Sequence, residues 1–122
     1  MSGKIMVIDD HPYMRDILAN FLGAGGHQFA LCSDGASALE RLGREPFDLV
    51  VTDLRLPDLP GFTVVRRVKE LRPSTPVALI TGAGDLVPSQ ELGRYGIDYL
   101  LPKPFTRQQF MTVVASALGQ PV

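Results

Sequence analysis

The sequence has few of the features that mark membrane, secreted or disulfide-linked proteins. Cys32 is the single cysteine among 122 residues, which excludes an internal disulfide and fits a reducing compartment. No apolar run approaches the roughly 18 residues of a membrane span, and the first residues lack the apolar stretch of a signal peptide. The composition therefore predicts a cytoplasmic protein that does not bind membranes.

The sequence also has no excess of positive or negative charge. The chain has 12 Lys and Arg against 13 Asp and Glu, a formal net charge of −1. Direct nucleic-acid binding is not expected, because phosphate contacts need surplus Lys and Arg. Hydrophobic residues make up 45% of the chain, enough for a core and too many for disorder. We expect one domain over 1–122, with its core at about 4–118.

Short apolar runs alternate with amphipathic segments along the whole chain. The runs predict strands at 4–8, 27–32, 49–52, 77–81 and 97–101, each followed by a helical pattern. Gly23, Gly25 and Gly26 are expected to stop the first helix, and Thr106 with Gln109 forms a capping box for the last. This alternation predicts an α/β fold, a doubly wound parallel sheet with helices on both faces.

Polar residues stand where these strands end. Asp9 and Asp10 follow the first strand, Asp53 the third and Thr81 closes the fourth, while the fifth leads to Lys103. Ligands bind beyond the carboxyl ends of strands in an open parallel sheet. The three carboxylates cluster if the first and third strands are neighbours.

Clustered carboxylates repel one another, and a hard divalent cation relieves the repulsion. Oxygen ligands with room for water suit Mg²⁺, whereas Cys32, His11 and His27 lack the spacing of a soft-metal site. Beside Mg²⁺, one carboxylate can act as nucleophile toward a phosphoryl group, whose charge Lys103 and Thr81 would stabilise. The residues predict a phosphoryl-transfer site that keeps its product on the protein.

The chain resembles the receiver domain of two-component response regulators. The matching motifs are Asp9-Asp10, Asp53-Leu54-Arg55-Leu56-Pro57, Thr81-Gly82 and Lys103-Pro104-Phe105. The resemblance runs from Lys4 to about Leu118 and implies a flavodoxin-like sheet of strand order 2-1-3-4-5.

The resemblance also implies a separate role for each acidic residue. Asp53 would be the phosphoacceptor, and Asp10 a direct Mg²⁺ ligand. Asp9 would act mainly through a metal-bound water, and the backbone carbonyl of Arg55 would complete the protein's share of the metal shell.

The remaining motif residues would bind the phosphoryl group or change position when it is bound. Lys103 would bind the group, with a cis peptide bond before Pro104, and Thr81 would be the switch hydroxyl. The family usually has Tyr or Phe three residues before the lysine, but that position is Leu100, and Tyr99 precedes it. Either the strand is bulged or slipped, or the aromatic signal is absent.

By resemblance, a histidine kinase or phosphotransfer protein would phosphorylate Asp53 and so switch contacts with a downstream protein. The chain would be a self-phosphorylating acceptor with slow autodephosphorylation and no separate substrate, hence not an enzyme. Only 119–122 follow the expected core, so we expect no effector domain, unless the chain is a fragment of a larger regulator or hybrid kinase. The sequence does not decide whether the chain forms a homodimer.

Two other functions are weighed against this one. A receiver-like interaction module independent of phosphorylation would be consistent with Leu100. A small Mg²⁺-dependent phosphohydrolase would need a general acid and a substrate-covering cap, for which the chain offers no candidate. His11 is interpreted as a loop residue and not as a ligand or phosphodonor. The basic run of Arg66, Arg67, Lys69 and Arg72 is interpreted as a solvated helix face.

Overall fold

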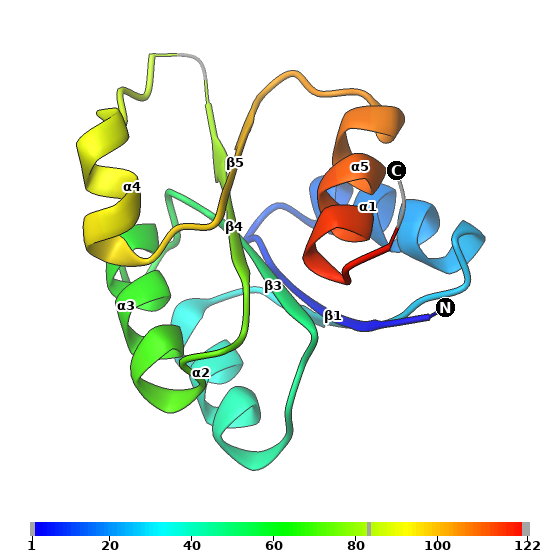
Figure 1. Ribbon diagram of the computed structural model, residues 1–122, viewed down its shortest axis with the longest axis horizontal. Helices are drawn as coiled ribbons and strands as arrows, with labels where there is room; N and C mark the ends of the chain where they lie inside the picture. The colour runs from blue at the N-terminus through cyan, green and yellow to red at the C-terminus, as the bar shows by residue number, and fades with distance from the viewer. Residues whose placement is uncertain (1, 83, 121–122) are drawn as a thin grey trace.

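Five parallel strands form one sheet in the order β2-β1-β3-β4-β5, as predicted (Figure 1). The structure is a computed structural model that describes residues 2–82 and 84–120. The predicted domain 1–122 therefore includes Met1, Ala83, Pro121 and Val122, which lie outside the described residues. The strands are β1 (Lys4–Ile8), β2 (Gln28–Cys32), β3 (Leu49–Asp53), β4 (Val77–Thr81) and β5 (Tyr99–Pro102).

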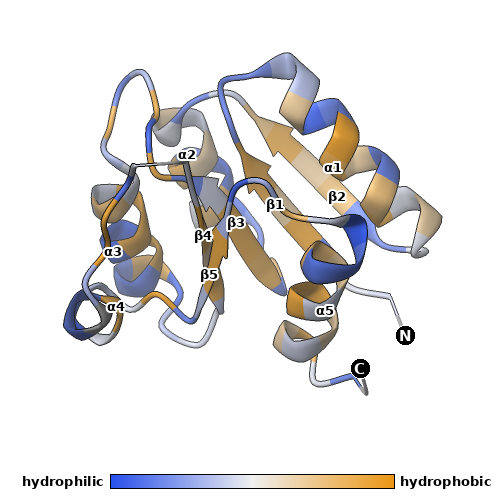
Figure 2. Cartoon of the chain, turned by 90° about the horizontal axis from the view of Figure 1, so that it is seen from above, coloured by the Kyte–Doolittle hydropathy of each residue, from blue (hydrophilic) through white to orange (hydrophobic). Residues whose placement is uncertain are grey.

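Helices cover both faces of the sheet, which makes the fold doubly wound. Figure 1 shows α1 and α5 on one face and α2, α3 and α4 on the other. Because both faces are covered, the strands are apolar along their length, and in Figure 2 they form a hydrophobic layer between the helices. The helices are α1 (Pro12–Ala24), α2 (Gly35–Arg44), α3 (Gly61–Leu71), α4 (Ser89–Tyr95) and α5 (Arg107–Ala117).

Alternate residues of each central strand enter two separate cores. In β1, Met6 and Ile8 pack with α2 and α3, whereas Ile5 and Val7 pack with α1 and α5. All five residues of β3 and of β4 are buried. The two central strands therefore hold the ends that carry Asp53 and Thr81 in fixed positions.

The helix ends agree with the sequence expectation. Helix α1 passes through Gly23 and ends at Ala24 with Gly25 as its C-cap, so the last two of the three expected glycines stop it. The backbone leaves the helix where Gly26 adopts a φ of 80°, a left-handed conformation that glycine adopts without strain. The capping box of Thr106 and Gln109 is present at the start of α5.

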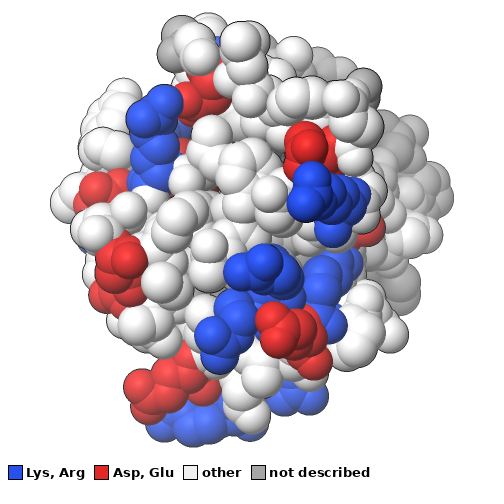
Figure 3. Space-filling view, turned by 90° about the vertical axis from the view of Figure 1, so that its left-hand side faces the viewer, with Lys and Arg blue, Asp and Glu red and all other residues white. Residues whose placement is uncertain are grey.

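Basic and acidic side chains are interleaved on the face formed by α2, α3 and α4 (Figure 3). On α3, Arg66 and Arg67 are exposed, whereas the ammonium group of Lys69 lies 2.7 Å from the carboxylate of Asp98. This arrangement agrees with a solvated helix face. Among the described residues, no helix has the length and apolar character needed to cross a bilayer.

Candidate functional site

The carboxyl ends of the strands bring the predicted polar residues to one edge of the sheet. Strands β1 and β3 are hydrogen-bonded neighbours, so Asp9 and Asp10, which follow β1, lie beside Asp53 at the end of β3. Strand β4 pairs with β3 and ends at Thr81, and β5 pairs with β4 just before Lys103. The structure thus gathers all five residues from segments far apart in the sequence.

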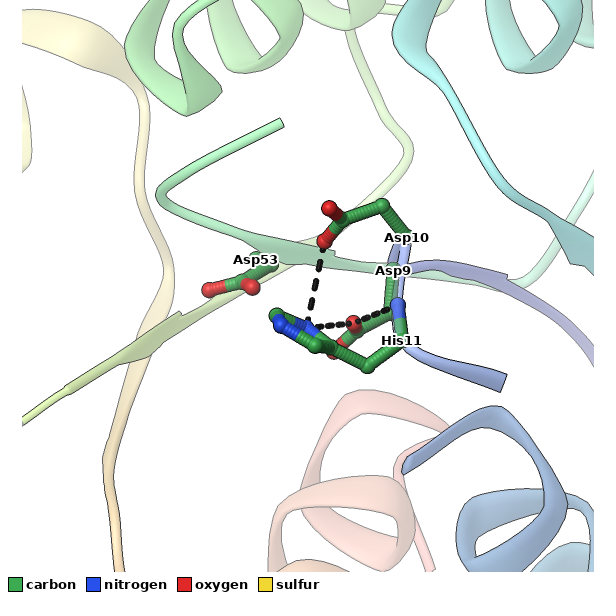
Figure 4. Close-up of side chains that lie close together, drawn as sticks. All are labelled: Asp9, Asp10, His11 and Asp53. Atoms are coloured by element: carbon green, nitrogen blue, oxygen red, sulfur yellow. Dashed lines mark hydrogen bonds and ion pairs between the residues drawn. The ribbon is translucent and has the colours of Figure 1, made fainter. Parts of the chain in front are cut away.

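Asp9, Asp10 and His11 form a tight cluster directly after β1 (Figure 4). The Nδ1 atom of His11 lies 3.0 Å from Oδ1 of Asp9 and 3.1 Å from Oδ1 of Asp10. The backbone N–H of His11 donates to the same Asp9 oxygen at 2.9 Å. One ligand atom from each of these residues and from Asp53 lies within 4.8 Å of the others.

Asp53 is a buried carboxylate with an electrostatically unfavourable setting. Its pKa lies above the ordinary value, first because burial penalises the charge and then because Asp9 is close. The ammonium group of Lys103 and the backbone N–H groups of Arg55 and Leu54 oppose this rise in pKa. Lys103 Nζ is 3.9 Å from Asp53 Oδ2, an ion pair loose enough to leave room at the carboxylate.

Thr81 and Lys103 are connected to each other through the backbone. The N–H of Lys103 donates to the carbonyl of Thr81 at 2.7 Å, and the side chain of Thr81 is almost fully buried. The peptide bond between Lys103 and Pro104 is cis, as expected. Thr81 and Lys103 therefore lie next to each other, at the ends of the neighbouring strands β4 and β5.

An ion pair joins the loops that follow β3 and β4. The guanidinium of Arg55 pairs with Oδ1 of Asp85, while Oδ2 of Asp85 accepts the backbone N–H of Gly82 at 2.7 Å. These hydrogen bonds hold the pKa of Asp85 below its usual value. The loop after the proposed phosphoacceptor is thereby tied to the loop after Thr81.

The fifth strand is regular, which decides between the two interpretations of Leu100. Tyr99 pairs with Ala78 and Leu100 with Leu79, without a bulge or slip. Leu100 packs toward the α2–α4 core, whereas Tyr99 packs toward the core under α1 and α5. The aromatic residue usual at position 100 is therefore absent, and Tyr99 lies on the opposite face of the sheet.

The carboxylate cluster fits a divalent cation. Asp9 is completely buried, and its Oδ2 atom has no hydrogen-bond partner among the residues that the structure describes. A buried carboxylate oxygen without a partner is costly unless a cation or water binds it. Together with Asp10 and Asp53, Asp9 offers the oxygen ligands that Mg²⁺ prefers.

Three site features were missed by sequence reasoning. His11 lies in the loop before α1, as expected, but contacts both neighbouring carboxylates, and Asp85 pairs with a residue 30 positions earlier. Gly61 packs against the turn after β3, where an added Cβ would lie 2.6 Å from the carbonyl oxygen of Asp53. The Asp-Asp-His sequence was a signal for the first contact, but the other two have no sequence signal that we can identify.

Comparison with known proteins agrees with this arrangement. A family model described as the response regulator receiver domain matches residues 5–115. The response regulator protein PilR of Pseudomonas aeruginosa is 36% identical over 115 residues, which are 94% of this chain and 26% of PilR. The sensor histidine kinase RcsC of Escherichia coli is 34% identical over 102 residues, which are 84% of this chain and 11% of RcsC.

Solved structures give the same result. A response regulator receiver domain protein from Clostridium thermocellum superposes with a TM-score of 0.89 at 28% identity, covering 96% of this chain and 94% of that one. The chain spans about a quarter of the length of the first curated relatives that it matches. The chain belongs to the response regulator receiver domain family of two-component signalling systems.

Proposed function

We propose that this receiver domain is a phosphoacceptor, and that a histidine kinase or phosphotransfer protein transfers a phosphoryl group to Asp53 in a Mg²⁺-dependent reaction. The observation that carries this proposal is the buried carboxylate of Asp53, with Lys103 Nζ at 3.9 Å and the carboxylates of Asp9 and Asp10 beside it. The proposal takes the chain as one domain over 1–122.

In the proposed reaction, a carboxylate oxygen of Asp53 attacks the phosphorus atom of a phosphohistidine. The bond between phosphorus and the imidazole nitrogen breaks, and that nitrogen keeps the electron pair and takes a proton from solvent. The product is an acyl phosphate on Asp53. Lys103 would bind one phosphoryl oxygen through its ammonium group, and the Thr81 hydroxyl would donate to another.

The metal ligands would be Asp9, Asp10 and Asp53, with the carbonyl of Arg55 completing the set. Asp10 would bind Mg²⁺ directly and Asp9 mainly through a water. Bound Mg²⁺ would neutralise charge on the phosphoryl oxygens during transfer. The unpartnered Oδ2 of Asp9 supports this assignment, because a cation or its water would satisfy that oxygen.

The output of the reaction would be a change in contacts with a downstream protein, without a separate substrate. Movement of Thr81 toward the acyl phosphate would pull on the loop that leads to α4. Helix α4 has only seven residues, and Gly93 lies within it. A short helix with a central glycine is cheap to rearrange, so this neighbourhood is suited to carry the signal.

A second candidate function has one observation in its favour. Leu100 occupies the position where an aromatic side chain usually follows the switch hydroxyl, and the regular register of β5 keeps Tyr99 away from it. A receiver that binds its partner without regard to phosphorylation would not need that aromatic residue. The two candidates differ in whether Asp53 must be phosphorylated for the partner to bind.

The deciding experiment is incubation with Mg²⁺ and acetyl phosphate, followed by intact-mass measurement. Wild type should gain the mass of one phosphoryl group and Asp53→Ala should gain none. Asp16→Ala is the matched control, because Asp16 is an exposed carboxylate on α1, and it should be phosphorylated like wild type. An adduct on Asp53→Ala, or none on wild type even with a beryllofluoride probe, would refute the phosphoacceptor function.

A further inference from the structure

His11 places a nitrogen atom between the two carboxylates that follow β1. Its Nδ1 atom is 3.0 Å from Asp9 Oδ1 and 3.1 Å from Asp10 Oδ1, and Figure 4 shows the ring extending toward both. These carboxylates are the only partners of the ring among the described residues. The His11 ring is therefore part of the acidic cluster.

The backbone of His11 is held by hydrogen bonds on both sides. His11 is the N-cap residue of α1, but its side chain makes no capping hydrogen bond, and Pro12 follows at the first helical position. Its N–H donates to Asp9 Oδ1 and its carbonyl accepts the N–H of Arg15. These bonds fix the backbone of His11, while its side chain, 64% exposed, is positioned by its contacts with the two carboxylates.

The distances fit neighbouring ligands around one ion. Two ligand atoms that each lie about 2.1 Å from an ion, at a right angle, are about 3.0 Å apart. The 3.1 Å distance from His11 Nδ1 to Oδ1 of Asp10, the proposed direct ligand, matches that separation. The unpartnered buried Oδ2 of Asp9 independently indicates that the cluster receives a cation.

We propose that His11 Nδ1 is a direct ligand of the same metal site, and that it raises the affinity of the site for Zn²⁺ and Co²⁺ more than its affinity for Mg²⁺. Imidazole nitrogen is a good ligand for transition ions, whereas Mg²⁺ prefers oxygen. The nitrogen would bind through its lone pair, with the ring hydrogen on Nε2. This inference rests on the proposed function, because it uses the same carboxylates, and it adds an ion preference to that site.

Calorimetric titration with MgCl₂, CoCl₂ and ZnCl₂ tests the inference on wild type, His11→Ala and His11→Asn. Loss of second-shell groups alone costs about 10–100-fold in metal affinity, so His11→Ala should weaken Zn²⁺ and Co²⁺ binding by at least about tenfold. Mg²⁺ affinity should change by less than about twofold, because its oxygen ligands remain. In His11→Asn an amide oxygen takes the place of Nδ1, and Zn²⁺ affinity should fall nearly as far.

The visible spectrum of the Co²⁺ complex supplies a readout that does not depend on phosphorylation. The wild-type spectrum should differ from that of His11→Ala, because a nitrogen ligand is replaced by water. His27→Asn is the matched control, since His27 lies at the other end of the sheet and the Asn oxygen can still accept the N–H of Gly3, as His27 Nδ1 does. This control should bind Zn²⁺ like wild type.

Three results would overturn the inference. They are unchanged Zn²⁺ affinity in His11→Ala, an equal loss of Mg²⁺ and Zn²⁺ affinity, and a loss in His27→Asn as large as in His11→Ala. Each can occur while acetyl phosphate still modifies Asp53, which would leave the proposed function intact. Conversely, transition-ion binding that depends on His11, without any adduct on Asp53, would support the inference and refute only the phosphoacceptor function.

Discussion

Acidic residues occupy both ends of the sheet, but their surroundings are opposite. At the amino end, Asp48 accepts the backbone N–H of Lys4 at 2.8 Å and Glu45 pairs with the Lys4 ammonium at 2.6 Å. At the carboxyl end, Asp9 keeps a buried oxygen without a partner, and Asp53 has its nearest cation 3.9 Å away. The two amino-end carboxylates are thus paired with protein groups, whereas the candidate site keeps carboxylate oxygens that a cation can bind.

The pKa values express the same contrast. Hydrogen bonds from Lys4 and Arg41 lower the pKa of Glu45 to about 2, whereas burial and the nearby charge of Asp9 raise the pKa of Asp53. The amino end therefore stabilises Glu45 in its charged form. At the carboxyl end the charged form of Asp53 costs stability, which a bound cation would recover.

The largest expected effect concerns a paired carboxylate, Asp98. Its Oδ2 atom accepts the N–H of Val77 at 2.8 Å and pairs with Lys69. Asp98→Ala leaves the N–H at the start of buried strand β4 without this partner, which should lower the free energy of unfolding by about 2 kcal/mol. Urea denaturation measures this, and Asp98→Asn, which keeps an oxygen acceptor, should lose clearly less. Equal losses would show that the hydrogen bond to Val77 is not the cause.

Mg²⁺ should stabilise the carboxyl end and leave the amino end unaffected. At ten times its dissociation constant, an ion that binds only the folded state adds about 1.4 kcal/mol to the free energy of unfolding. Thermal denaturation with and without Mg²⁺ should show this gain in wild type and in Asp16→Asn. The gain should be largely absent in Asp10→Asn, and its full retention there would place the ion elsewhere.

Asp53→Asn and Glu45→Gln should change stability in opposite directions. Because the pKa of Asp53 is raised, its charged form destabilises the fold at neutral pH. Without metal, Asp53→Asn should therefore raise the free energy of unfolding at pH 7, on the order of 1 kcal/mol. Glu45→Gln should lower it, because the lowered pKa of Glu45 means that its charged form is stabilising.

Urea denaturation as a function of pH separates these two effects. The advantage of Asp53→Asn should shrink as pH falls through the raised pKa of Asp53, where the wild-type carboxyl becomes neutral. The deficit of Glu45→Gln should persist at neutral pH and disappear between about 4.5 and about 2. A destabilised Asp53→Asn at neutral pH would contradict the proposed contrast between the two ends of the sheet.

The smallest effect is expected for an exposed ion pair on α2. Arg41 pairs with Glu45, and such a pair on a helix surface contributes little to stability. Arg41→Ala should therefore lower the urea midpoint only slightly. Arg44→Ala is the matched control, because Arg44 and Glu40 are 3.7 Å apart and both highly exposed, and it should have less effect. A larger loss of stability for Arg44→Ala than for Arg41→Ala would show that the Arg41–Glu45 pair is not the stronger of the two.

The sequence predicts the fold and the composition of the site because both depend on periodic patterns. Unbroken apolar runs such as Val77–Thr81 indicate strands buried on both faces, and parallel strands end at one edge. The sequence therefore places Asp53 and Thr81 at the same edge of the sheet. The run of glycines after Leu22 indicates where α1 ends but not which glycine ends it, because a single glycine inside a helix costs only roughly 1 kcal/mol.

Contacts within the loops could not be predicted in this way. The position of His11 against two carboxylates depends on the backbone angles of one turn, and the Arg55–Asp85 pair depends on two loops bending toward each other. Neither loop has a periodic pattern. The regular register of β5 likewise had to be observed before the absence of the aromatic residue at Leu100 could be separated from a bulge.

The close packing of Gly61 has a genetic consequence. A Cβ at this position would lie 2.6 Å from the carbonyl oxygen of Asp53 and 2.7 Å from Cα of Leu54, so any substitution displaces the backbone that carries the proposed acceptor. A screen for alleles that lose phosphoryl acceptance should therefore return mutations in the Gly61 codon beside those in the Asp53 codon, although Gly61 has neither charge nor side chain.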